Sequence, residues 1–140
     1  MGNKRIMVSG GFDPVHIGHI QMINAASQWG EVIVVINSDS WLKRKKGYVF
    51  MPWQERAYLL QQIKGVTEVS AVDDQDGTVC EAIIRLHPDA FANGGDRKKN
   101  NTPEMTVCDD MSIQMLWGIG GKDKPQSSSW LVNKAMEQLK

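Results

Sequence analysis

Runs of consecutive apolar residues alternate along the whole chain with the spacing typical of helices. Residues 32–36, Val-Ile-Val-Val-Ile, are β-branched without interruption, as expected of a central parallel strand buried on both faces. Residues 17–29 instead place Ile20 and Ile23 on one stripe before Gly30, which predicts an amphipathic helix. The same criteria predict strands at 5–8, 31–37, 68–72, 90–92 and 113–119, and helices at 17–29, 53–63 and 78–86, from 102, and from 127 onward.

Strands separated by helices of about ten residues predict βαβ units with right-handed crossovers. We therefore expect one α/β domain over residues 1–140, a Rossmann-like, doubly wound, parallel five-stranded sheet with helices on both faces. Thr78, followed three residues later by Glu81, resembles a capping box for the helix that the His87-Pro88 pair must end. In open α/β sheets ligands bind beyond the carboxyl ends of the strands, so the residues that follow each strand are the candidates for function.

Composition narrows the class of protein. The chain has 140 residues and 16 Lys plus Arg against 16 Asp plus Glu, so its neutral charge gives no support to broad nucleic-acid binding. Hydrophobic residues at 41% and charged residues at 23% argue against disorder. No apolar stretch approaches the roughly 20 residues that cross a bilayer, and the polar N-terminus lacks a signal-peptide core. We expect a cytoplasmic protein with no membrane or nucleic-acid partner, in which Cys80 and Cys108 are reduced thiols.

The most unusual segment follows the first predicted strand and reads Gly-Gly-Phe-Asp-Pro-Val-His-Ile-Gly-His over residues 10–19. His16 and His19 stand three residues apart where a helix begins, so both project from one face near its positive end. Free N–H groups and two imidazoles form an anion site that suits phosphate. The alternative is a capped helix with two surface histidines. Two of the three histidines in the chain lie here, which favours the anion site.

Residues 11–19 resemble the HxGH signature of the cytidylyltransferase-like nucleotidyltransferases. Residues 37–40, 43–47 and 54–56 are similar to the bacterial heptose-phosphate adenylyltransferases and to the glycerol-3-phosphate cytidylyltransferases, residues 93–96 occupy the family's Gly-Gly-Asp position, and residues 126–129 match its Ile-Ser-Thr-Thr type motif. The resemblance implies an enzyme that joins a nucleoside triphosphate to a phosphorylated small molecule and releases pyrophosphate.

For the triphosphate, the resemblance implies that His16 and His19 are catalytic and stabilise charge as the α-phosphorus is attacked in line. The backbone of Gly11 and Phe12 would lie against the nucleotide. Relatives often have Thr where this chain has Gly11, so one hydroxyl contact is expected to be absent.

Residues 43–46, Lys-Arg-Lys-Lys, form a dense basic cluster that we predict in a loop after the second strand. By resemblance this loop closes over the phosphates, with Lys43 binding the nucleotide and Lys46 taking part in catalysis. Lys45 matches the family's lysines less well. The alternative is a solvated basic turn.

Arg56 lies within an otherwise apolar predicted helix. The resemblance assigns it to the phosphate of the acceptor, which suits the fork geometry of a guanidinium. The alternative is an exposed ion pair or a side chain that extends along the surface. We interpret its neighbour Trp53 as a packing residue.

The second half of the chain supplies further nucleotide contacts by resemblance. Asp96 would hold the nucleotide or the surroundings of its metal, and Ser127, Ser128 and Ser129 would bind the β- and γ-phosphates at a helix start. Lys122 occupies the position of an Arg in the family, and a Lys neutralises phosphate without a bidentate fork.

We expect no protein metal site, because Cys80 and Cys108 lack partners at zinc spacing, and Mg²⁺ would arrive on the triphosphate. The sequence leaves open whether the nucleotide is CTP or ATP and whether the acceptor is a polyol, sugar or amino-alcohol phosphate. Family members commonly dimerise, so the resemblance implies a homodimer. The alternative function is a catalytically silent nucleotide-binding module that acts as a sensor or assembly partner, and Gly11 and Lys122 are its support.

Overall fold

The computed structural model describes residues 4–93, 102–119 and 128–139. In these ranges the strands are β1 (Arg5–Gly10), β2 (Glu31–Ile36), β3 (Val66–Ser70), β4 (Ala90–Asn93) and β5 (Gln114–Trp117), and the helices are α1 (Ile17–Ser27), α2 (Asp39–Lys46), α3 (Trp53–Gln61), α4 (Cys80–Leu86), α5 (Pro103–Asp110) and α6 (Ser128–Gln138). Each predicted strand and helix is present, with small shifts at its ends. The helix α2 was not predicted.

The five strands form one sheet in the order β3-β2-β1-β4-β5, and all described pairs are parallel. The β-branched run of β2 lies between β1 and β3, where it pairs on both edges. Strand β1 is central and pairs with β2 over its full length. This arrangement confirms the predicted doubly wound parallel sheet.

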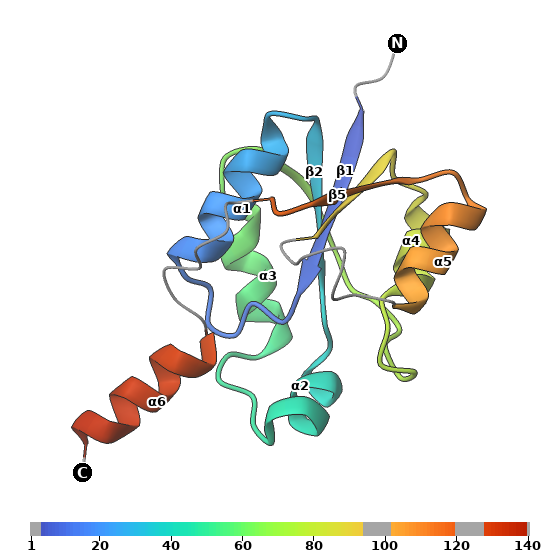
Figure 1. Cartoon of the computed structure of the whole chain (residues 1–140). Helices are drawn as coiled ribbons and strands as arrows, with labels where there is room; N and C mark the ends of the chain where they lie inside the picture. Colours follow the sequence, from blue (N-terminus) through green and yellow to red (C-terminus); the bar gives the residue numbers. More distant parts are fainter. Residues whose placement is uncertain (1–3, 94–101, 120–127, 140) are drawn as a thin grey trace.

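Alternating residues of the central strands feed two separate cores. Ile6 and Val8 of β1 pack with residues of α1 and α3, whereas Met7 packs with residues of α4 and α5. Successive strand side chains point to opposite faces, so one strand contributes to both layers. Accordingly, α1 and α3 cover one face of the sheet and α4 and α5 cover the other (Figure 1).

The predicted capping box at the start of α4 is wrong. The N-cap residue is Val79, and it makes no side-chain capping bond. The Thr78 backbone N–H and hydroxyl both donate to Asp76, and Glu81 instead accepts from the backbone N–H of Asp73. Nearby acceptors in the acidic turn therefore compete successfully for the groups that would have formed the box.

The closing helix α6 extends away from both layers of the molecule (Figure 1). None of its described apolar residues is buried: Met136 is 57% exposed, and Leu139, just after the helix, is 86% exposed. Among the helices in the described ranges, none has the length and apolar character needed to span a bilayer.

Candidate functional site

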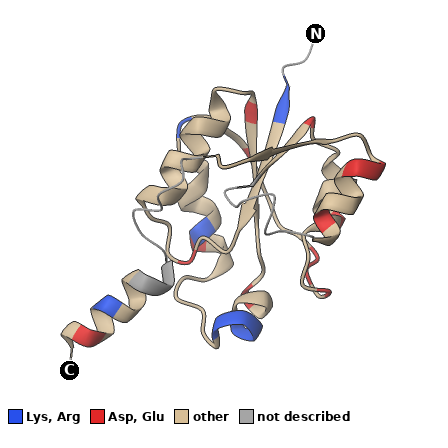
Figure 2. Cartoon of the chain, in the orientation of Figure 1, with Lys and Arg blue, Asp and Glu red and all other residues tan. Residues whose placement is uncertain are grey.

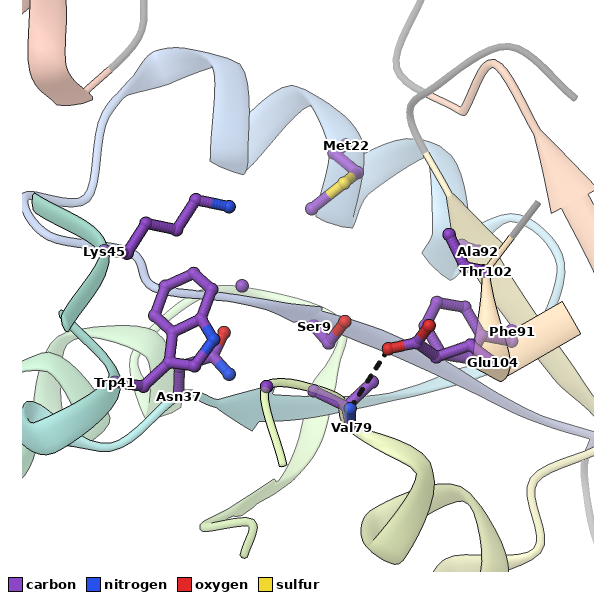
Figure 3. A pocket seen from close by; sticks show the side chains of 12 residues that line it. Ser9, Met22, Asn37, Trp41, Lys45, Val79, Phe91, Ala92, Thr102 and Glu104 are labelled. Atoms are coloured by element: carbon purple, nitrogen blue, oxygen red, sulfur yellow. Dashed lines mark hydrogen bonds between the residues drawn. The ribbon is translucent and has the colours of Figure 1, made fainter. Parts of the chain in front are cut away.

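The candidate site lies at the carboxyl ends of the central strands, where the chain leaves β1 and leads to α1. A cavity of about 320 Å³ opens there, between α2, α5 and the start of α4 (Figure 3). Its lining residues are Ser9, Gly10, Met22, Asn37, Trp41, Lys45, Gly77, Val79, Phe91, Ala92, Thr102 and Glu104. This is the position at which a ligand is expected in a doubly wound sheet.

The two histidines cap the first turn of α1 reciprocally. Nδ1 of His16, the N-cap residue, accepts from the backbone N–H of Gly18 at 3.0 Å, and Nδ1 of His19 accepts from the backbone N–H of His16 at 3.2 Å. The two rings are stacked with centroids 3.8 Å apart. Because a nitrogen that accepts a hydrogen bond carries no proton, these contacts place the proton of each neutral ring on Nε2. Both rings therefore act as caps through one nitrogen and as donors through the other.

Phe12 packs against one of these two histidines. Its ring is 2% exposed and meets the ring of His19 edge-on, with centroids 4.7 Å apart. Its backbone has a φ of 53°, in the left-handed region that is uncommon for residues other than glycine. The side chain of Phe12 thus fixes the position of a histidine, and a nucleotide contact at Phe12 would have to come from its backbone.

Arg56 is fully buried and does not reach the cavity. Its Nη1 donates to the backbone oxygens of Gly11 at 2.7 Å and Asn37 at 2.9 Å, and its Nε donates to that of Met51 at 2.9 Å. Its Nη2 lies 2.5 Å from Oδ1 of Asp39. The contact to an acceptor phosphate that the resemblance implied does not fit this placement, because the guanidinium already joins the segments that follow β1 and β2. In the sequence, the signal for this structural role was a charged residue within an otherwise apolar predicted helix.

Asp13 completes the same buried cluster. It is 0% exposed, and its two carboxylate oxygens accept from the backbone N–H groups of Phe50 at 2.7 Å and Met51 at 2.5 Å. Trp53 donates to the backbone oxygen of Ile36 at 3.2 Å and packs on the core, so its interpretation as a packing residue is confirmed.

The basic cluster 43–46 is helical, and the predicted loop is wrong. The Ser38 hydroxyl caps α2 by accepting from the backbone N–H of Trp41 at 3.0 Å, and Gly47 ends the helix at a φ of 90°. Only Leu42 of this helix is buried, so the stabilising contacts lie at its ends. Basic residues gather on α2, while acidic ones lie on α5 and near α4 (Figure 2).

Asp74 holds the start of α2 from the loop before α4. Its carboxylate accepts from the Ser38 backbone N–H at 2.8 Å, the Ser38 hydroxyl at 2.7 Å and the Asn37 amide at 3.0 Å. Burial by itself would raise the pKa of Asp74, but these hydrogen bonds, led by the one from Ser38, keep the pKa below its ordinary value. Asp74 is therefore an ionised anchor for the helix that carries the lysines.

The three lysines of α2 have different surroundings. The Nζ of Lys46 donates to the backbone oxygen of Asp13 at 2.9 Å, and burial lowers the pKa of Lys46, aided by the nearby cations of Arg56 and Lys45 and opposed by Asp13. Lys45 lines the cavity, with Nζ 4.8 Å from the ring centroid of Trp41. Lys43 is exposed and is not among the residues that line the cavity.

The structure gives a physical reason for Gly11. A Cβ built at Gly11 would lie 3.0 Å from Cδ2 of Leu42 and 3.4 Å from Cζ3 of Trp41. Trp41 and Leu42 thus occupy the space into which the Thr of relatives would extend. Sequence reasoning did not identify Trp41 and Glu104 as residues that line the cavity. Gly11 was a signal for Trp41, because a side chain at position 11 would meet the indole.

Several predicted contacts lie outside the described residues, namely Asp96, Lys122 and Ser127. Ser128 and Ser129 begin α6, but their side chains are not described. In the described ranges, no group of three His, Cys, Asp or Glu side chains could hold a metal ion.

Comparisons with known proteins agree on one family. A model of the cytidylyltransferase-like family matches residues 7–116. The bifunctional protein HldE of Nitratiruptor sp. is 36% identical over 100 residues, which cover 69% of this chain and 21% of that protein. FAD synthase of Methanobrevibacter smithii is 32% identical over 103 residues, which cover 71% of this chain and 67% of that protein. The chain therefore spans about a fifth of this HldE and about two thirds of this FAD synthase.

Among solved structures, the lipopolysaccharide core biosynthesis protein from Thermoplasma volcanium has the same fold. It matches with a TM-score of 0.67 and 24% sequence identity, over 83% of this chain and 96% of that one. At this identity the likeness supports the fold alone.

Proposed function

Because the chain belongs to the cytidylyltransferase-like family, we propose that it transfers a nucleoside monophosphate from CTP or ATP to a phosphorylated small molecule and releases pyrophosphate. The family predicted from residues 11–19 is confirmed by the match over residues 7–116. The relatives named HldE and FAD synthase support a nucleotidyltransferase, and the substrates are the proposed part.

The histidine pair is the observation that carries the proposal. Both Nδ1 atoms accept from the backbone of the first turn of α1, so both Nε2 atoms are donors at the positive end of an 11-residue helix. Donors that are fixed before substrate arrives need no reorganisation as charge develops, which is the main source of electrostatic catalysis. Phosphoryl-type transfer depends mostly on such positioning and charge stabilisation.

The proposed reaction is a single in-line displacement. An oxygen of the acceptor phosphate forms a bond to the α-phosphorus, the bond from that phosphorus to the bridging oxygen of the β-phosphate breaks, and pyrophosphate leaves with the electron pair. His16 and His19 donate to the phosphate oxygens on which charge accumulates. The Nζ of Lys46 donates to the backbone oxygen of Asp13, in the segment between β1 and α1, and Lys46 adds positive charge from the α2 side. Lys43 points to solvent and is a weaker candidate for a nucleotide contact.

We propose that Mg²⁺ enters as the complex with the triphosphate, since Mg²⁺ usually keeps several waters and binds substrate phosphates through few protein ligands. When bound, it would neutralise charge on the departing pyrophosphate. The carboxylate of Asp13 does not suit a metal, because both of its oxygens already accept backbone N–H groups. Asp96, Lys122 and Ser127–Ser129 are proposed nucleotide contacts on the strength of the resemblance.

The test is pyrophosphate release with CTP and with ATP in the presence of Mg²⁺, against a panel of phosphorylated acceptors. His16→Asn is the most informative variant, because Asn is a favoured N-cap residue and retains an acceptor at that position. We expect kcat to fall at least about 100-fold, the usual cost of removing one preorganised donor. His87→Asn is the matched control, since His87 ends α4 away from the site and its replacement should leave kcat unchanged.

A loss of thermal stability in His16→Asn without a loss of kcat would assign the histidines to structure alone. Nucleotide binding by calorimetry without turnover on any acceptor would support the alternative, a silent binding module. The homodimer stays a prediction that sedimentation can test.

A further inference from the structure

The helix α2 carries lysines of the proposed site, but its own packing does little to hold it in place. It spans eight residues, fewer than the roughly 12–15 that an isolated helix needs to be stable in water, and Leu42 is the one buried residue among the eight. Lys43, Arg44 and Lys45 are exposed, so this half of the helix contributes little to the core. The position of α2 therefore depends on the contacts made at its two ends.

Asp74, in the loop before α4, contacts both ends of this helix. At the first turn, its carboxylate accepts from the backbone N–H of Ser38 at 2.8 Å and from the Ser38 hydroxyl at 2.7 Å. At the last turn, its backbone oxygen accepts from Nη2 of Arg44 at 2.8 Å. Asp74 is 3% exposed, so water competes little for these bonds. One residue thus spans α2, and its negative charge lies at the helix N-terminus, where the helix dipole favours it.

The last residue of α2 contacts the segment that leads to the histidines. The Nζ of Lys46 donates to the backbone oxygen of Asp13 at 2.9 Å, and Asp13 lies three residues before His16. A shift of α2 would move this ammonium group away from the segment between β1 and α1. Misplacement of a catalytic group by about 1 Å can cost about 100-fold in rate. Whatever holds α2 therefore also holds a group that the reaction uses.

We infer that Asp74 is a positioning residue for the transfer reaction, which acts through α2 to hold Lys46 against the segment between β1 and α1; the inference rests on the proposed function. The Asp74 carboxylate is engaged by three donors of its own chain, the Ser38 backbone N–H and hydroxyl and the Asn37 amide. Asp74 therefore acts on the reaction through the helix and not by touching a substrate.

The alternative is that Asp74 only stabilises the fold, and the titration of Lys46 distinguishes the two roles. Burial lowers the pKa of Lys46 while the ammonium group is held in place. The other titratable groups described near it are Asp13, Lys45, Tyr48 and Arg56. Since desolvation is the largest influence, the pKa of Lys46 rises toward the ordinary value of 10.5 once α2 loosens and water reaches it. A purely structural role leaves this pKa unchanged.

The experiment compares Asp74→Asn with a matched control, Asp76→Asn. Asp76 is an exposed residue of the same loop, and its carboxylate accepts from the backbone N–H and the hydroxyl of Thr78, both at 2.9 Å. We expect Asp74→Asn to lower kcat for pyrophosphate release roughly 10- to 100-fold and to move the alkaline limb of kcat to higher pH. Hydrogen exchange of the α2 amides should become at least about tenfold faster, the effect of losing one charge-assisted hydrogen bond. Asp76→Asn should change none of these values.

Ser38→Ala tests the same path from the helix side, and it keeps the experiment informative if Asp74→Asn does not fold. It removes the hydroxyl that donates to Asp74 and that accepts from the backbone N–H of Trp41 at 3.0 Å. We expect Ser38→Ala to lower kcat and to move the alkaline limb in the same direction as Asp74→Asn. Because both variants break one contact, the loss of kcat in the double variant should be smaller than the product of the two single losses. Strictly independent losses would overturn the path through Ser38.

The outcomes separate this inference from the proposed function. Faster exchange of the α2 amides with kcat and its alkaline limb unchanged would overturn the inference and leave Asp74 a structural residue. Should the wild-type protein release no pyrophosphate with any substrate, the proposed function fails, and titration of Lys46 by NMR decides whether Asp74 positions it. A midpoint that rises in Asp74→Asn and not in Asp76→Asn would support the positioning role, and an unchanged midpoint would overturn it.

Discussion

Two sets of charged residues lie near the carboxyl ends of the central strands, and they differ in what they contact. Asp13 and Arg56 are buried and bind backbone groups of the same chain, and Arg56 also pairs with the carboxylate of Asp39. Lys45 and Glu104 face one cavity from opposite ends. A buried charge whose groups are all engaged stabilises the fold, whereas charges that line an open space are available to a ligand.

Arg56 illustrates this difference. A guanidinium near a phosphate-binding loop suggests a phosphate contact, yet here it fixes the spacing between the segments after β1 and β2. Of the four basic residues at 43–46, Lys45 is the one that lines the cavity, although the resemblance ranked it below Lys43 and Lys46. Burial therefore distinguishes a cation that binds backbone of its own chain from a cation that faces the cavity.

The largest expected effect comes from breaking the buried set. Arg56→Ala leaves the backbone oxygens of Gly11, Asn37 and Met51 without their donor. We expect the free energy of unfolding to fall by about 3–5 kcal/mol, the usual cost of removing one member of a buried charged cluster. Urea denaturation measures this loss.

Arg85→Ala is the matched control for Arg56→Ala. Arg85 pairs with Glu81 on the surface of α4, and exposed pairs of this kind contribute little, about 1 kcal/mol or less. If Arg56→Ala is as stable as this control and only KM for the acceptor rises, Arg56 belongs to the functional set after all.

A smaller effect is expected where the two sets meet, at Gly11. Gly11→Thr would force its side chain against Leu42 and Trp41, and overpacking of this kind typically costs about 1–3 kcal/mol. Trp41→Ala in the same chain makes room, so the double variant should be more stable than the sum of the two single costs predicts. A double-mutant cycle on thermal unfolding measures this coupling, and strictly additive costs would show that Trp41 does not replace the side chain of relatives.

The smallest effect concerns pH and Lys46. Burial lowers the pKa of Lys46 below its ordinary value of 10.5, so its positive charge is lost at a lower pH than that of an exposed lysine. We expect kcat to fall on this limb as Lys46 deprotonates. Lys46→Arg keeps the charge and should move the limb to higher pH, as a pH profile of kcat would show. An unchanged limb would assign the titration to another group.

The sequence predicted the sheet because its signals are local and strong. The unbroken run of residues 32–36 identified the strand that pairs on both edges, and the histidine spacing identified the start of α1. Such patterns depend on neighbours along the chain, so they survive without knowledge of tertiary contacts.

What sequence reasoning missed depends on distant partners. The helix α2 has one buried residue, Leu42, and its first turn is held by Asp74, 36 residues after Ser38. Arg56 reaches Gly11, 45 residues before it, and Trp41 faces Glu104 across a cavity that exists only in the folded chain. Ser38 and Gly47, the two cap residues of α2, were local evidence for a helix. The dense positive charge of residues 43–46 nevertheless led to the prediction of a loop.

The reciprocal caps at His16 and His19 restrict which amino acids these positions can accept during evolution. Each position requires one side chain whose two nitrogens have opposite hydrogen-bonding roles, an acceptor toward the helix and a donor away from it. Lys and Arg carry positive charge but have no acceptor, so either one would leave a backbone N–H of the first turn without its partner. Selection at these two positions therefore acts on the ring as a whole, and a substitution that conserves charge is there no more conservative than one that removes it.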